Sequence, residues 1–271
     1  MASSAAAWQR AAAHPDPAKL AELDPKGTSY AAFPPRRLGA EELRDAMLAV
    51  SGELNRELGG IPAHPEINEE VALQPRHIMG SVGPAYQADA LPSRRNRRTI
   101  YAERIRTLAD PLLEVFNKPG SAESCEARDS SAVTPQVFAL MNGAGATQRS
   151  IAMALRLQEK KKEPRQQIAG AIRLAFGRHA REGELDTLQE HYREMLRYHE
   201  GVRPGKVVYP TEIRRSLVEE FTGDPFEYTE SLSHYTRYTY DKTGADAAPS
   251  TRALADICLL LINSNEFIYV Y

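Results

Sequence analysis

The sequence predicts a mainly α-helical protein, and three observations lead to this prediction. Apolar residues recur every three or four positions over several long stretches, as in Leu43, Met47, Val50 and Leu54; this is the spacing of one face of a helix. Proline-containing starts such as Thr134-Pro135 introduce further stretches of this kind, because proline is well tolerated in the first helical turn. The 271 residues, with 42% hydrophobic side chains, are enough to bury a sizeable core.

The predicted helices follow one another along the chain. A short helix covers 17–23 with Asp16 as its cap, and a longer one covers 40–55 with two glutamates in its first turn, where carboxylates favour the helix dipole. The segment 98–116 supplies apolar anchors and is broken at Asp110-Pro111. The remaining predicted helices cover 134–142, 147–162, 164–176, 181–200, 211–221 and the apolar stretch 254–262.

Two segments interrupt this helical pattern. Between residues 61 and 95, repeated prolines and glycines predict a long loop region with room for a short strand. Five prolines within the first 35 residues likewise exclude a long helix there. We therefore predict a loosely structured N-terminal segment over 1–35 and a single helical domain over 36–271, which together make an irregular helical protein.

Composition argues against two classes of partner. The net charge is −2, whereas a general nucleic-acid binder usually carries a strong basic excess. The longest apolar run, 257–262, is far shorter than the roughly 20 residues that a membrane-spanning helix needs. We expect no nucleic-acid partner and no membrane span, and the start of the chain lacks a signal-peptide pattern.

The sequence contains no complete catalytic or metal-binding motif. None of the seven histidines forms a zinc-binding helical pair with a nearby acid, and no CxxC or CxxCH occurs, so we expect no metal site and no haem attached to this chain. Cys125 and Cys258 are interpreted as free thiols, although one disulfide stays possible. Arg128 could activate Cys125 as a nucleophile, but no base lies near it in sequence, and a buried structural cysteine is the simpler interpretation.

Two clusters could bind a ligand. Six arginines form the densest local charge (Arg94, Arg95, Arg97, Arg98, Arg104 and Arg106). They would suit an anion, or they could form an internal network with Glu103, Asp110, Glu114 and Glu126, which we favour. A late aromatic group could stack on sugars or partners or cover an edge of the domain, which is the commoner role (Phe226, Tyr228, His234, Tyr235, Arg237, Tyr238 and Tyr240).

Six groups of residues stand in a recognisable order. They are Arg36-Arg37-Leu38 with 41–52; 96–101; 111–113 with Phe116-Asn117; Ser124-Cys125 with Arg128, 134–136 and 140–142; 175–178; and 254–258 with 263–267. In this order they resemble the planctomycete-type domain of unknown function 1553. One departure is Ala144, where the family more often has a bulky apolar residue.

The resemblance implies a helical fold and a particular setting. Members form the C-terminal part of large exported proteins that often carry a cytochrome-c-like domain, so a c-type haem would belong to an upstream domain. It also implies that this chain begins inside the family's domain and is N-terminally truncated. In the full-length setting the protein would be periplasmic or on the cell surface.

We therefore expect an accessory or interaction module of a larger exported redox or polysaccharide-processing protein, with a cytochrome-c-like domain or a polysaccharide as partner. The candidate polar or anion-binding cluster is Arg97, Arg98, Cys125, Arg128, Gln136, Asn142 and Glu266, and a buried polar scaffold is its favoured interpretation. The alternative is a carbohydrate-acting enzyme domain with an arginine- and acid-lined pocket, which uses acids such as Glu41 or Asp45. That alternative predicts that Arg98, Arg128, Gln136 and Glu266 converge on one pocket.

Overall fold

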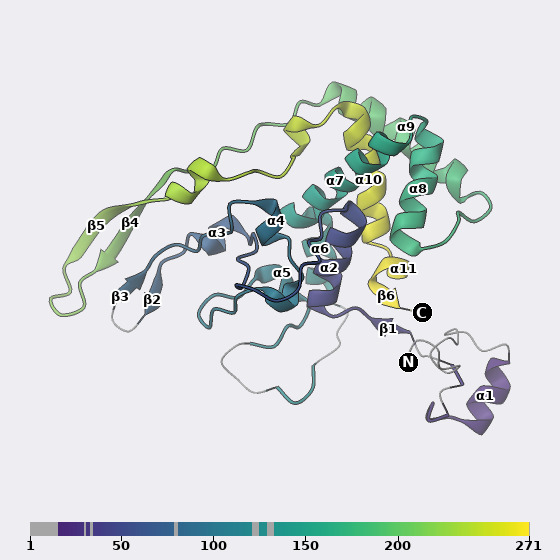
Figure 1. Ribbon diagram of the computed structural model, residues 1–271, viewed down its shortest axis with the longest axis horizontal. Coiled ribbons are helices and arrows are strands. Elements are labelled where there is room, and N and C mark those ends of the chain that lie inside the picture. Colours follow the sequence, from purple (N-terminus) through teal and green to yellow (C-terminus); the bar gives the residue numbers. More distant parts are fainter. Residues whose placement is uncertain are drawn as a thin grey trace.

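The computed structural model describes residues 16–29, 31–32, 35–78, 81–120, 125–128 and 133–270. The mainly α prediction is confirmed. The described residues contain eleven α-helices, and their strands are short and pair only in antiparallel twos. Figure 1 shows a helical body from which a long two-stranded arm projects.

Helix α10 (Pro249–Ile262) forms the centre of the helical body. It packs against α7 (Ala144–Lys160), α8 (Pro164–Phe176) and α9 (Glu184–Gly201). Nearly all sides of α10 are apolar, and Leu254, Ile257, Cys258 and Ile262 are completely buried. A helix with so few polar positions is stable only inside a core. The helix predicted over 254–262 therefore lies at the centre of the helical body.

Helix α2 (Ala40–Ser51) lies against α7 and presents the predicted apolar face, with Leu43, Met47 and Val50 buried. Its first turn is fixed because the Glu42 carboxylate accepts a hydrogen bond from the Gly39 amide at 2.8 Å. The helix ends at Ser51, earlier than predicted, because Gly52 adopts a left-handed conformation with φ of 87°, which terminates helices.

The shorter helices complete the body and its edge. They are α5 (Pro111–Val115), α6 (Thr134–Asn142) and α11 (Asn265–Ile268). Strand β1 (Arg36–Arg37) pairs with β6 (Tyr269–Val270) near the end of the chain. Helix α1 (Pro17–Leu23) has the predicted Asp16 cap, buries no residue and lies apart from the body in Figure 1. The division at residue 35 stays a prediction.

The predicted loop region around residues 61–95 is irregular, with four short elements. These are α3 (Glu69–Ala72), β2 (Arg76–Ile78), its hairpin partner β3 (Ser81–Gly83) and α4 (Pro92–Arg95). Isolated bridges between Asn55 and Arg97 and between Ala63 and Ala102 fasten the start of this region to the segment around the 3₁₀ helix η2 (Thr99–Tyr101).

The predicted helix over 211–221 is wrong. These residues form strand β4 (Glu212–Val218), which pairs antiparallel with β5 (Pro225–Ser231) to make the projecting arm. Ile213 and Leu217 lie four residues apart, a spacing that puts two side chains on one face of either a helix or a strand. Pairing with β5 across the turn at Gly223, whose φ is 77°, decides between them. The arm leads into the 3₁₀ helices η3 (Ser233–Arg237) and η4 (Gly244–Asp246).

Candidate functional site

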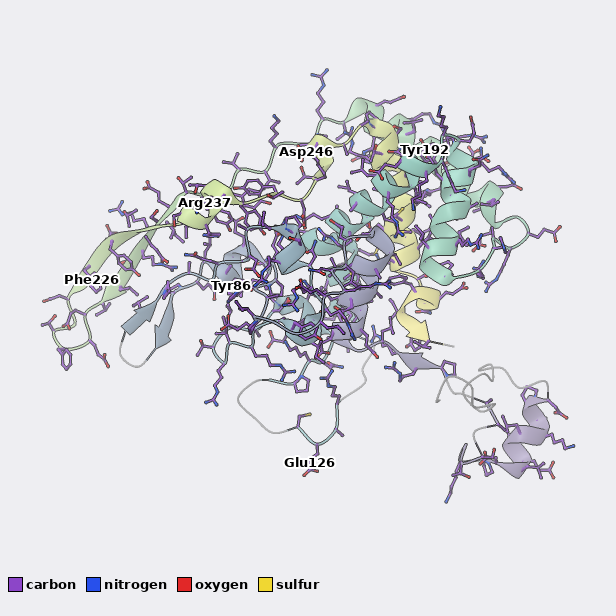
Figure 2. All side chains as sticks on the ribbon, viewed as in Figure 1. Tyr86, Glu126, Tyr192, Phe226, Arg237 and Asp246 are labelled. Atoms are coloured by element: carbon purple, nitrogen blue, oxygen red, sulfur yellow. The ribbon has the colours of Figure 1, made fainter. Side chains whose placement is uncertain are left out.

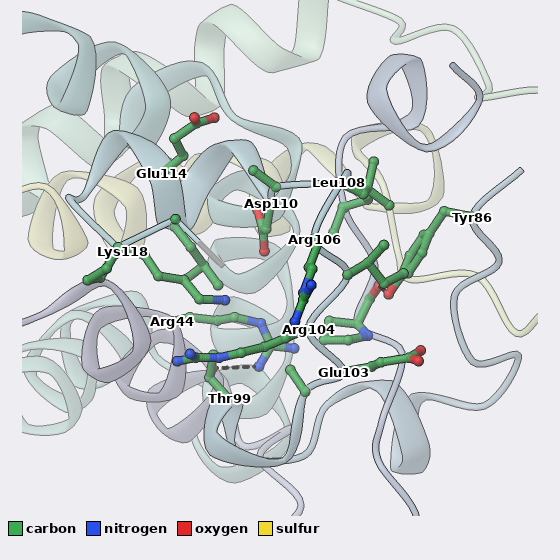
Figure 3. Close-up of a pocket in the computed structure, with 18 residues that line it drawn as sticks. Arg44, Tyr86, Thr99, Glu103, Arg104, Arg106, Leu108, Asp110, Glu114 and Lys118 are labelled. Carbon is green, nitrogen blue, oxygen red and sulfur yellow. Dashed lines mark hydrogen bonds between the residues drawn. The ribbon is translucent and has the colours of Figure 1, made fainter. Parts of the chain in front are cut away.

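A pocket of about 330 Å³ opens beside helix α5. Its apolar walls include Tyr86, Leu108 and Leu113, and its polar lining consists of four cations and three acids (Arg44, Arg104, Arg106, Lys118, Glu103, Asp110 and Glu114). Figure 3 shows these side chains arranged around the opening. A concave site with apolar walls and convergent charged groups is the usual form of a small-ligand site.

Arg44 forms the floor of the pocket and is held rigidly. Helix α2 directs it to η2, where its guanidinium donates to the carbonyls of Arg95 and Arg97 at 2.9 and 3.1 Å and to the Thr99 hydroxyl at 3.0 Å. The neighbouring Asp45 accepts from the Thr99 amide at 2.8 Å. Burial lowers the pKa of Arg44, partly offset by the Asp110 carboxylate. The floor therefore carries a fixed positive charge, because an arginine stays protonated in proteins.

The acids of the pocket are engaged elsewhere or are turned away. Asp110 caps helix α5 by accepting from the Leu112 amide at 3.0 Å, and burial raises its pKa although Arg44 opposes this. The Glu103 carboxylate contacts the His64 imidazole. Figure 3 shows the Glu114 carboxylate pointing away from Arg104 and Arg106. None of these acids forms an ion pair with a lining cation within 4 Å.

Two cations of the pocket have no partner within the part of the chain that the structure describes. Among the described residues, no hydrogen bond or ion pair holds the Arg106 guanidinium or the Lys118 ammonium, although both line the pocket. Arg104 reaches Glu41 only at 4.0 Å. Burial lowers the pKa of Lys118, and the charge of Arg104 beside it lowers it further. Like charges held together in a partly buried site are stabilised by a bound anion.

Three residues of the sequence-derived cluster lie away from this pocket in the described structure. Arg97 is buried and donates to the Ile61 carbonyl at 2.8 Å, to Glu57 at 3.3 Å and to Gly59. Gln136 is also buried and donates to the Val115 carbonyl at 2.9 Å, which ties α6 to α5. Asn142 is the exposed last residue of α6. Arg97 and Gln136 therefore act as internal clamps.

Three of the other four residues of that cluster form ion pairs with residues distant in sequence. Arg98 lies 3.8 Å from Asp45, and Arg128 forms a two-pronged pair with Glu41 at 2.7 and 3.1 Å. Glu266 on α11 binds Arg178 at 2.5 and 2.7 Å. The predicted convergence of Arg98, Arg128, Gln136 and Glu266 does not occur, since none of them lines the pocket.

Cys125 is the remaining member. It is exposed, so its interpretation as a buried structural cysteine is wrong, whereas Cys258 is buried in α10. Both cysteines are free, as expected. The exposed Cys125 thiol donates only to the Ala127 carbonyl at 2.9 Å, and among its described neighbours no histidine pairs with it as a base.

The six arginines between residues 94 and 106 do not lie together in the structure. Arg95 is completely buried and pairs with Asp241 at 2.7 Å and with Glu66 at 3.5 Å, so the predicted pairing of this cluster with Glu103, Asp110, Glu114 and Glu126 is wrong within the described residues. The cluster runs from α4 to the irregular segment that follows η2, and its side chains therefore leave the backbone in different directions. Arg95 also lies over the Tyr238 ring at 4.5 Å.

The aromatic residues between 226 and 240 form two separate groups of stacked or tilted rings. Tyr235, Tyr238 and Tyr240 cluster with Tyr209, which stacks on Tyr240 at 4.2 Å between ring centroids. Tyr209 was missed because it lies outside the aromatic-rich stretch. Phe226 and Tyr228 stack on the arm at 6.1 Å, apart from that cluster.

Sequence reasoning missed Arg44 and Lys118 as pocket residues. A signal for Arg44 existed, because it stands four residues before the buried Leu48 and therefore on the inner side of α2. No pattern connects Lys118 with Arg104, since they come from separate irregular segments.

The described residues contain no group of three histidine, cysteine, aspartate or glutamate side chains that could hold a metal ion. No helix in them combines the length and the apolar character needed to cross a membrane.

Comparison with known proteins places the chain in a family. A family described as "Protein of unknown function (DUF1553)" matches residues 1–192, which contain the pocket, and the closing motif at 254–267 lies beyond the matched range. No curated protein and no solved structure matches the chain. Because the match extends over well more than half of its 271 residues, the protein belongs to the DUF1553 family of unknown function.

Proposed function

We propose that this protein is an accessory binding module of a larger exported polysaccharide-processing or redox protein, and that its pocket takes a carboxylate or sulfate group of an acidic polysaccharide. The observation that carries the proposal is the presence in one pocket of two cations, Arg106 and Lys118, that have no partner among the described residues, together with a third weakly paired cation, Arg104. The exported setting, with a cytochrome-c-like domain as a further partner, is what the family resemblance implies.

The pocket chemistry suits an acidic sugar. A guanidinium binds a carboxylate or sulfate through two parallel hydrogen bonds, and an ammonium adds a compact charge. The apolar side chains of Ile105 and Leu108 line the same opening and offer a surface for the carbon skeleton of the ligand. A bound anion would also relieve the repulsion between Lys118 and Arg104.

The test is calorimetric titration with oligosaccharides of one length that are uronic, sulfated or neutral. We expect the acidic ligands to bind and the Lys118→Ala and Arg106→Ala variants each to weaken binding about tenfold or more, since a hydrogen bond to a charged group contributes about 1.5–3 kcal/mol. Salt should weaken binding as well. Arg237→Ala is the matched control, because Arg237 is exposed on η3 outside the pocket.

Two results would contradict the proposal. One is equal binding of the neutral and acidic ligands, and the other is unchanged affinity in both pocket variants with Arg237→Ala as reference.

A second candidate, a carbohydrate-acting enzyme domain, is favoured by one observation. Burial raises the pKa of Asp110 in the pocket, and a carboxyl group that serves as a general acid usually has its pKa raised in this way. Asp110→Asn should remove hydrolysis of an acidic oligosaccharide while keeping the α5 cap, because asparagine caps helices as well as aspartate. If the wild-type protein binds the oligosaccharide but releases no new reducing ends, the enzyme candidate fails.

A further inference from the structure

The tip of the β4–β5 arm presents apolar side chains to solvent. Phe221 in the turn is 94% exposed, and Val218 and Phe226 beside it are 63% and 44% exposed. Figure 1 shows this tip far from α5, and Figure 2 places Phe226 near the same end of the arm. An isolated two-stranded hairpin is only marginally stable, and a projecting apolar tip of this kind marks an interaction site.

The turn that holds Phe221 outward is well defined. The Glu219 carboxylate accepts from the amides of Phe221 and Thr222 at 3.0 and 2.6 Å. The Gly223 amide donates to the Glu219 carbonyl at 2.9 Å, with Gly223 in a left-handed conformation. The exposure of Phe221 is therefore built into the turn.

The root of the arm is anchored to the body. Arg215 is buried, donates to the Leu73 carbonyl at 2.7 Å and pairs with Glu230 at 2.5 Å. Glu230 in turn accepts from the Ala85 amide at 2.7 Å. The arm thus has a fixed base and a free tip.

The tip is acidic as well as aromatic. The two arginines of the arm are each paired with a glutamate, Arg214 with Glu227 and Arg215 with Glu230. Among the described residues no cation pairs with Glu220 or Asp224, and Glu220 is exposed directly beside Phe221. The tip therefore offers an aromatic ring flanked by free carboxylates.

The basic pocket has the complementary chemistry. Part of its wall is apolar, its four cations outnumber its three acids, and Arg106 and Lys118 have no partner there among the described residues. The tip does not fill the pocket of its own molecule, since Phe221 is almost fully exposed. We propose that the tip of one copy docks into the pocket of a second copy of this chain, with the Phe221 ring against the apolar wall and the Glu220 carboxylate facing Lys118 and Arg106.

This inference rests on the proposed function, because it names a carboxylate-bearing partner for the same pocket. The tip and the pocket are different surfaces, so the contact is heterologous and yields either a closed assembly or a growing chain of molecules. One ring and a few carboxylates make a contact well below the roughly 1,600 Å² of a standard interface. The association is therefore weak, rises with protein concentration and falls with salt.

Sedimentation equilibrium of the full chain tests the inference over a range of concentrations at low and high salt. We expect association at low salt, at least tenfold weaker association for Phe221→Ala, and loss of association for Glu220→Lys. Val208→Ala is the control, because Val208 is 86% exposed and lies outside both the tip and the pocket. These exposed substitutions leave the Glu219 turn in place, and circular dichroism checks that the fold is kept.

A charge-swap experiment identifies the partner of Glu220. Lys118→Glu and Glu220→Lys should each fail to associate alone, and the double variant Lys118→Glu/Glu220→Lys, in which the two charges are exchanged, should associate again. The inference is overturned if the wild-type chain stays monomeric at every concentration, if neither tip variant changes its association, or if the double variant does not associate.

The two proposals fail in distinguishable ways. If acidic oligosaccharides bind in a Lys118-dependent manner while the protein stays monomeric, only the docking of the arm is wrong. If the protein associates through the tip but binds no acidic saccharide, the proposed ligand class is wrong and the docking inference stands. Absence of both effects removes the pocket as an anion site.

Discussion

Replacing Asp241 tests how the arm and the helical body are held together. Asp241 lies just after the aromatic cluster and joins two arginines from separate elements. Its carboxylate contacts Arg95 of α4 at 2.7 Å and also pairs with Arg149 of α7. All three side chains are buried, with exposed fractions of 0% for Arg95 and 7% for the other two.

The expected loss in the free energy of unfolding depends on the partners that Arg95 and Arg149 keep when Asp241 is replaced. Removing one partner of a buried ion pair costs about 3–5 kcal/mol, because the remaining charge is left without compensation. In Asp241→Ala, Arg95 retains the carbonyls of Ala90 and Thr239 at 3.1 and 2.6 Å, and Arg149 retains Glu53 at 3.1 Å. We therefore expect the lower end of the range, a loss of about 3 kcal/mol in the free energy of unfolding.

Urea unfolding followed by far-ultraviolet circular dichroism measures this loss. Arg165→Ala is the control, because its pair with Asp186 is exposed, and such pairs contribute at most about 1 kcal/mol. Asp241→Asn keeps the shape but not the charge and should also destabilise the protein. A loss for Asp241→Ala no larger than that of Arg165→Ala would refute the reasoning.

Three further predictions concern the thiols and two carboxyls. A thiol reagent should modify the exposed Cys125 rapidly and Cys258 only on unfolding, because Cys258 is fully buried and burial raises the pKa of its thiol; equal rates in the folded protein would contradict this. Hydrogen bonds from Arg178 lower the pKa of Glu184 to about 2, so this pair stabilises the fold above pH 4.5 and is lost as the pH falls toward 2. Arg178→Met should remove about 1 kcal/mol of that acid-dependent stability, after allowance for solvent screening, measured by urea unfolding at a series of pH values. Burial raises the pKa of Asp110 above its ordinary value of 3.8, so its charged form is disfavoured on folding, and Asp110→Asn should stabilise the protein at neutral pH; the gain should vanish below pH 3.8, and a gain independent of pH would contradict the cause.

The helical body could be predicted because its helices bury a continuous apolar face. In α9, Leu188 and Tyr192 are buried at the predicted spacing, and in α10 the apolar stretch marks the core directly. The arm could not be predicted in the same way. Ile213 and Leu217 fit either a helix or a strand, and only pairing with β5 settles the matter. That pairing is a tertiary interaction, which propensity and spacing do not report.

The candidate site was less accessible to sequence reasoning for a geometrical reason. The arginines around residue 97 are neighbours in sequence, yet Arg95 and Arg97 turn into the protein while Arg106 enters the pocket. The pocket itself joins α2, Tyr86 and the segment from Glu103 to Lys118. No periodicity relates such segments, because their arrangement depends on how an irregular backbone is held in place.

Buried and half-buried arginines do much of that holding. Arg44, Arg97 and Arg252 donate to carbonyls in the turns and loops around α4, α2 and η4. In these segments few carbonyls have partners in a helix or sheet, and buried carbonyls need donors. These three arginines are therefore used inside the fold and are not available to a ligand. The cations that do not donate to such carbonyls are therefore the ones that indicate where a ligand binds. Within the pocket these are Arg106 and Lys118, and a test of function should begin with them.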